Sequence, residues 1–124
     1  FYFKFTLRTK YFMKLITIYE LSKVSNNKNV CIAGLVIIRQ KPVTANGVTF
    51  LTLEDETGTV NIICWEKVYN KYQTEIVSAK LLRINGKLQR QNNVTNIIAH
   101  SIENLSKLLD LLPQLNIRTD HIKN

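Results

Sequence analysis

The chain has 124 residues, a net charge of +8 and an isoelectric point of about 9.7. That length suits one domain around one core, and hydrophobic and charged fractions of 45% and 21% exclude a disordered chain. No apolar run approaches transmembrane length and no Cys/His spacing resembles a zinc site, so we expect no membrane contact, metal or cofactor. Cys31 and Cys64 each lie in an apolar run. They indicate buried thiols of a reduced, cytoplasmic protein, without excluding a disulfide.

The positive charge is unevenly distributed. Residues 1–14 hold Lys4, Arg8, Lys10 and Lys14 and no acid, whereas residues 15–124 hold the other 13 basic residues and all 9 acidic ones. A basic balance favours polyanionic partners, although charge that only maintains solubility gives the same pattern. We expect residues 1–14 to be a basic N-terminal extension, 15–112 the folded domain and 113–124 a polar tail.

The first half of the domain predicts a short helix and three strands. Residues 17–25 place apolar side chains at helical spacing. Residues 30–39 are rich in β-branched residues with Gly34 in the middle, which indicates a long strand with a bulge or sharp bend. Two further apolar runs at 48–54 and 59–65 are joined by a short glycine-containing turn and predict a β-hairpin.

The second half predicts a helix, two strands and a last helix. Residues 66–77 have the period of an amphipathic helix. Residues 80–90, with Gly86 as a bulge, and residues 94–100 predict strands, and residues 103–112 are amphipathic again. The order β-β-β-α-β-β with flanking helices is the plan of the OB fold, so we predict a small all-β protein with a five-stranded Greek-key barrel.

Strand alternation divides the side chains of the predicted hairpin between the barrel interior and the outer face. Leu51, Leu53, Val60, Ile62 and Cys64 are expected inside. The outer face is expected to carry Val48, Phe50, Thr52, Thr59, Asn61, Ile63 and Trp65.

Residues 34–72 carry a more specific pattern, GLVIIRQKPVTANGVTFLTLEDETGTVNIICWEKVYNKY. The run AGLV–RQ–P, then F-x-T-L-E-D-E-T-G, then a Trp seven residues later, resembles the C-terminal, tRNA-anticodon-type OB domain of bacterial error-prone C-family DNA polymerase III alpha subunits. The resemblance covers residues 30 to about 110. It implies single-stranded DNA binding next to a replication or repair polymerase, in a piece much smaller than that enzyme.

The resemblance does not extend to catalysis. The polymerase active site holds metal ions with a cluster of aspartates, whereas this chain has only Asp55, Asp110 and Asp120, well separated in sequence. Asp55 is expected to bond backbone amides near Gly58 and to shape the turn. No nucleophile–base pair or phosphate-binding glycine loop accompanies these residues, so we predict a non-catalytic domain without a small-molecule substrate.

The outer face of the second and third strands is the usual OB binding surface. Phe50 is the candidate stacking residue, with Thr52 and Asn61 beside it, although a place in the core or under the flanking helix is the alternative. Trp65 either stacks on a base or, as we favour, anchors the following helix. Basic and polar residues near the two loops that frame this face are candidate phosphate ligands, or else a solvated strand face: Arg39, Lys41, Arg83, Lys87, Gln89 and Arg90.

Two other functions stay open. OB barrels also dock proteins, and Ile63 and Trp65 with the terminal helix form an apolar patch that suits a polymerase or repair protein. Binding to RNA, above all to a tRNA anticodon, is the third alternative.

Overall fold

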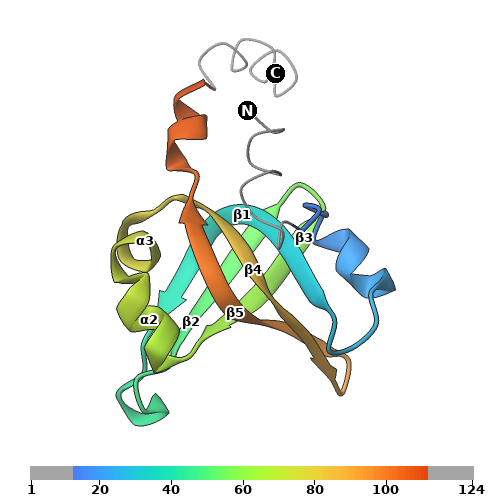
Figure 1. Cartoon of the computed structure of the whole chain (residues 1–124), viewed down its shortest axis with the longest axis horizontal. Helices are drawn as coiled ribbons and strands as arrows, with labels where there is room; N and C mark the ends of the chain where they lie inside the picture. Colours follow the sequence, from blue (N-terminus) through green and yellow to red (C-terminus); the bar gives the residue numbers. More distant parts are fainter. Residues whose placement is uncertain (1–12, 112–124) are drawn as a thin grey trace.

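The computed structural model describes residues 13–111, so the predictions for residues 1–12 and 112–124 lie outside it. Its centre is a closed barrel of five strands in the order β1-β2-β3-β5-β4 (Figure 1). All neighbours are antiparallel except β3 and β5, which run parallel. The predicted OB plan is therefore confirmed. The strands are β1 (Asn29–Gln40), β2 (Thr49–Asp55), β3 (Gly58–Cys64), β4 (Leu81–Gln91) and β5 (Val94–Asn104).

β1 serves two neighbours, as a long first strand must in a small barrel. Its residues 29–35 pair with β4 and its residues 35–40 pair with β2. Gly34 lies at this transition, where a Cβ atom would lie 2.9 Å from the carbonyl oxygen of Glu54. The bulge falls later, between Val36 and Ile38, so Gly34 marks the close approach of two strands and not the bulge itself.

A second irregularity lies in β4, where the pairing with β5 shifts between Asn85 and Gly86. This confirms the bulge predicted at Gly86, where a Cβ atom would collide with the carbonyl oxygen of Ile98. Beyond the bulge, Lys87 is paired with Ile98 on the outside of the barrel. The bulge thus sets which polar residues of β4 extend the outer surface beside β5.

The core follows strand alternation closely. The five side chains expected inside the predicted hairpin are all 5% exposed or less. Val48 was expected outside and this is wrong, because Val48 is only 6% exposed. It precedes the first paired residue, Thr49, so the alternation of the strand does not reach it.

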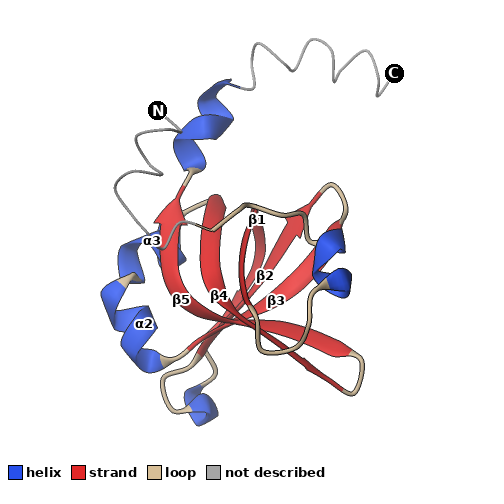
Figure 2. Cartoon of the chain, turned by 45° about the vertical axis from the view of Figure 1, so that its right-hand side comes forward, coloured by secondary structure: helices blue, strands red, loops and turns tan. Residues whose placement is uncertain are grey.

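Two short helices lie between β3 and β4 where one was predicted. α2 (Glu66–Lys71) and α3 (Gln73–Ser78) are separated at Tyr72, whose φ and ψ of −115° and 29° are not helical. Both segments still pack on the barrel: Val68 and Tyr72 are half-buried, and Ile76 is 1% exposed. Figure 2 shows them together at one side of the strands.

The flanking segments are 3₁₀ helices. η1 (Tyr19–Lys23) precedes β1, and η2 (Val43–Ala45) lies in the loop between β1 and β2. η3 (Ser106–Leu111) begins later than the helix predicted from residue 103, because β5 continues to Asn104 and buries Ile102. Within residues 13–111, no helix has the length and apolar character needed to cross a membrane.

Candidate nucleic-acid interface

Outward-facing side chains of β1, β2, β3 and β5 form two neighbouring rows across the barrel. The pairing of the strands fixes both rows, because each residue lies beside its partner on the next strand. A groove of about 310 Å³ follows them. We call this surface the platform, and its members are Gln40, Phe50, Ile63 and Ile98 in one row and Ile38, Thr52, Asn61 and Asn96 in the other.

Phe50 lies on the platform and not in the core. Its ring lines the groove and is half-buried, whereas its neighbour Leu51 is 1% exposed inside the barrel. Thr52 Oγ1 donates a hydrogen bond of 3.2 Å to Asn61 Oδ1. That bond fixes the amide of Asn61 two residues from Ile63, the partner of Phe50. An aromatic face and an oriented amide therefore lie side by side.

Trp65 directly follows Cys64, the last residue of β3. It precedes the first residue of α2, and 53% of it is exposed. It is not among the partly buried side chains packed against the core, and base stacking and helix anchoring both stay predictions. An exposed aromatic ring thus lies one residue beyond the paired part of β3.

Lys87 and Gln89 extend the platform onto β4. Lys87 is the partner of Ile98 and Gln89 is the partner of Asn96, so each prolongs one of the two rows. Both side chains are exposed. None of the platform residues, nor Lys87 or Gln89, is acidic. Lys87 supplies a positive charge at the edge of the rows.

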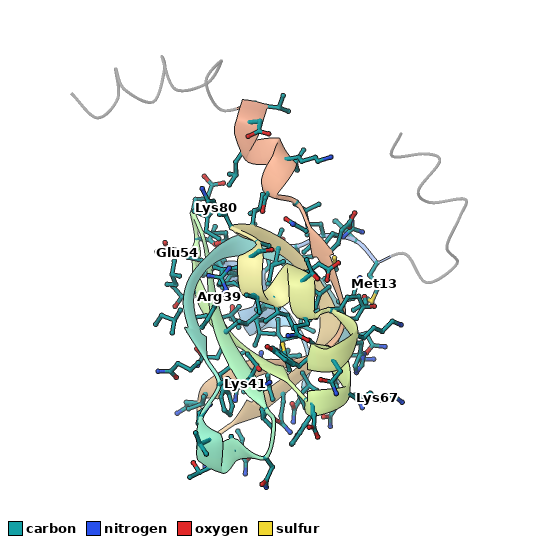
Figure 3. All side chains as sticks on the ribbon, turned by 90° about the vertical axis from the view of Figure 1, so that its left-hand side faces the viewer. Met13, Arg39, Lys41, Glu54, Lys67 and Lys80 are labelled. Carbon is teal, nitrogen blue, oxygen red and sulfur yellow. The ribbon has the colours of Figure 1, made fainter. Side chains whose placement is uncertain are left out.

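Arg39 and Lys41 hold helices instead of lining the groove. Arg39 Nε donates 2.7 Å to the carbonyl of Ile76, and Arg39 Nη2 donates to the carbonyl of Ala79. Lys41 Nζ lies 3.5 Å from the centre of the Tyr69 ring on α2. Figure 3 shows Arg39 beside α3 and Lys41 beside α2. A cation on the last carbonyls of a helix stabilises that end.

Arg90 and Arg83 also have structural partners. Arg90 Nη1 and Nη2 donate 3.0 Å and 2.7 Å to the carbonyls of Val24 and Leu21, which fastens η1 to β4. Arg83 lies before the Gly86 bulge, pairs with Glu103 at 3.7 Å and has a side chain only 16% exposed. The predicted basic frame of the groove is thus reduced, because these guanidinium groups bind carbonyls or a carboxylate.

Asp55 organises the turn between β2 and β3. Its Oδ1 accepts bonds from the amides of Thr57 and Gly58 and from Thr57 Oγ1, as the sequence predicted, and its Oδ2 accepts 2.8 Å from the amide of Ile18. Burial raises the pKa of Asp55, but these hydrogen bonds outweigh it and leave the pKa below its usual value. The carboxylate is structural, and within residues 13–111 no three His, Cys, Asp or Glu side chains are grouped to hold a metal.

Comparison with known families matches residues 30–105 to the OB-fold nucleic acid binding domain of the tRNA anticodon type. The chain belongs to that family. The error-prone DNA polymerases of Sinorhizobium medicae and Ruegeria pomeroyi are 44% and 51% identical over 93 residues, which is 75% and 74% of this chain. The chain spans about 8% of each polymerase, and it corresponds to an OB domain and not to a catalytic region.

Solved structures show the same fold at low sequence identity. Asparaginyl-tRNA synthetase from Pyrococcus horikoshii aligns with a TM-score of 0.64 and 15% identity over 77% of this chain and 24% of that one. Aspartyl-tRNA synthetase from Entamoeba histolytica aligns with a TM-score of 0.62 and 19% identity over 76% and 22%. These similarities support the OB architecture alone.

Several platform residues of the OB domain escaped the sequence analysis. Gln40 lies just beyond the strand predicted over residues 30–39, and Asn96 was not singled out although it alternates with the buried Ile97. Asn96 joins the site only because β5 runs parallel to β3, with Asn96 beside Asn61. The two paired residues are 35 positions apart in the sequence, so no pattern among neighbouring residues predicts that they meet.

Proposed function

We propose that this OB domain binds single-stranded DNA across the platform. The observation that carries the proposal is the Phe50 side chain in the groove beside the fixed amide of Asn61, with the exposed Trp65 one residue beyond β3. Stacking of bases on aromatic side chains contributes about 1–3 kcal/mol per base and accepts any base. An extended strand with its bases splayed on this face matches these groups.

The polar members of the surface supply the remaining contacts. The amides of Gln40, Asn61 and Asn96 are suited to base edges, since an amide both donates and accepts hydrogen bonds. Lys87 is suited to a phosphate on the β4 side. Among the described residues Lys87 is the one cation in these rows, so we expect moderate affinity, a salt dependence of about one phosphate contact and little sequence preference.

The relatives suggest where such binding operates. We propose that the domain holds single-stranded template near an error-prone polymerase during replication or repair, as part of that protein or beside it. Free, buried Cys31 and Cys64 are consistent with the reducing cytoplasm where such an enzyme works.

Fluorescence anisotropy with a labelled oligothymidine of about 12 nucleotides tests the proposal. Binding is expected at about 50 mM salt and should weaken about two- to threefold by about 200 mM, as one phosphate contact implies. Phe50→Ala should weaken binding roughly 5- to 150-fold, which corresponds to the loss of one stacked base. Val77→Ala is the matched control, because Val77 is an exposed apolar residue of α3 that lies off the platform.

Two outcomes separate the alternatives. No binding by the wild type at low salt would overturn the proposal and favour a protein-docking role for the exposed Trp65. Binding to tRNA that outcompetes oligothymidine, with the same loss in Phe50→Ala, would move the ligand class from DNA to RNA.

A further inference from the structure

A second groove, of about 410 Å³, lies between η1, the β2–β3 turn and the β4–β5 turn. Figure 1 shows η1 between these two turns at one side of the barrel. Most of its lining is uncharged and rich in hydroxyl and amide groups. These groups come from Tyr19, Ser22, Thr57, Thr59, Asn93 and Thr95.

This groove continues the platform. Thr59 is the next outward-facing residue of β3 after Asn61, and the two line the second groove and the platform groove respectively. On β5 the two grooves are lined by consecutive residues, Thr95 in the second groove and Asn96 in the platform groove. From Trp65 to Thr59 the strand rises about 20 Å at roughly 3.3 Å per residue. The two grooves therefore lie on neighbouring positions of β3 and β5, and we call them together the track.

Tyr19 is held rigidly at the far end of this track. Its side chain is 59% exposed and lines the second groove. Its amide donates 2.9 Å to Thr57 Oγ1, and η1 is further fixed by Asp55 at Ile18 and by Arg90 at its last carbonyls. An exposed ring on an immobilised backbone loses little freedom when a base stacks on it. Lys23 Nζ lies 5.4 Å from the centre of that ring, so a positive charge accompanies it.

The charge beside the track favours one edge. Glu54 is exposed on β2, where it is the partner of Thr59 and points outward like Thr52. Its carboxylate repels phosphates along the β2 side. A strand leaving the platform is therefore directed along the β3–β5 side, toward Thr95 and Tyr19.

We propose that the second groove extends the nucleic-acid path and that Tyr19 is a second stacking residue, with Lys23 contacting a phosphate. This inference rests on the proposed function of the platform and adds the length and direction of the bound strand. OB folds occupy about 4–16 nucleotides, and a single strand that reaches from Trp65 to Tyr19 has a length near the lower limit of this range. One end of that strand lies at η1.

The test compares oligothymidines of about 3 and about 12 nucleotides in anisotropy titrations at low salt. Tyr19→Ala and Tyr19→Leu should weaken binding of the longer strand about fivefold or more and leave the shorter one unchanged, whereas Tyr19→Phe should bind both like wild type. Thr59→Glu, which places an acid in the track at an exposed position, should also weaken the longer strand selectively. Trp65→Ala should weaken both lengths.

Thermal unfolding of each variant provides the control on folding. The Tyr19 and Thr59 variants should unfold like wild type, because both side chains are exposed and contribute nothing to the core. If the wild type and Phe50→Ala differ as expected but Tyr19→Ala and Thr59→Glu bind the longer strand like wild type, the extension is wrong and the platform proposal stands. If the wild type binds neither strand, both fail.

Discussion

Asp55 ties the β2–β3 turn to the start of η1, and Asp55→Asn tests how much that link stabilises the fold. The carboxylate accepts bonds of 2.7 Å and 2.6 Å from Thr57, 3.1 Å from Gly58 and 2.8 Å from Ile18. A hydrogen bond to a charged group contributes about 1.5–3 kcal/mol, and asparagine keeps only one acceptor oxygen. Because the site is partly exposed, we expect the free energy of unfolding to fall by about 2 kcal/mol near neutral pH.

The loss should depend on pH. Hydrogen bonds hold the pKa of Asp55 below its usual value of 3.8 in the folded protein, despite the opposing effect of burial. A lowered folded-state pKa adds stability that is fully present above the unfolded pKa and is lost as the pH falls through the folded one. The stability difference between wild type and Asp55→Asn should therefore be largest at about pH 7 and shrink below about pH 4.

Urea denaturation followed by circular dichroism at about pH 7 and about pH 2.5 measures both quantities. Equal stability of the two proteins at neutral pH would refute the structural role of Asp55. A difference that stayed constant into acid would refute the assignment of that role to its ionised form. Asp110→Asn is the control, because Asp110 is exposed in η3.

Three further predictions follow from the contacts of single side chains. Arg39→Ala removes the bonds to the carbonyls at the end of α3 and should lower the free energy of unfolding by about 1–3 kcal/mol. The salt dependence of DNA binding should not change, and unchanged stability in urea together with a weaker salt dependence would contradict this role. Burial raises the pKa of the Cys64 thiol to about 12 and also raises the pKa of Cys31. A thiol reagent near pH 8 should therefore label neither cysteine in the native protein and both in urea, and labelling of the folded protein would show that the barrel opens readily. Lys87→Ala should reduce the slope of log affinity against log salt by about 0.7, the effect of one phosphate contact on a single strand, and an unchanged slope would place Lys87 outside the bound region.

Local patterns were enough to predict the surface of the central hairpin. The alternation of Phe50 with Leu51, and the Asp55–Gly58 turn, depend on neighbours within the same few residues. The bulge at Gly86 was also visible, since a glycine within an apolar strand indicates a position where another backbone approaches closely. The fold and the outward position of Phe50 were therefore predictable from the sequence.

The roles of the arginines depend on long-range geometry. Arg90 bonds carbonyls 66 and 69 residues earlier in the chain, and Arg39 bonds carbonyls 37 and 40 residues later. A basic residue near a loop gives the same sequence signal whether it contacts phosphate or ends a helix. Only the closed barrel, which brings η1 to β4 and α3 to β1, distinguishes the two.

The most direct measurement uses Trp65, which is the only tryptophan of the 124 residues and lies at the end of the platform. Binding of oligothymidine across the platform predicts saturable quenching of its fluorescence at about 50 mM salt, with the midpoint moving to higher DNA concentration as salt rises and in Phe50→Ala. Binding that is seen by anisotropy while the emission of Trp65 stays constant would contradict it, because the strand would then lie on another face of the barrel.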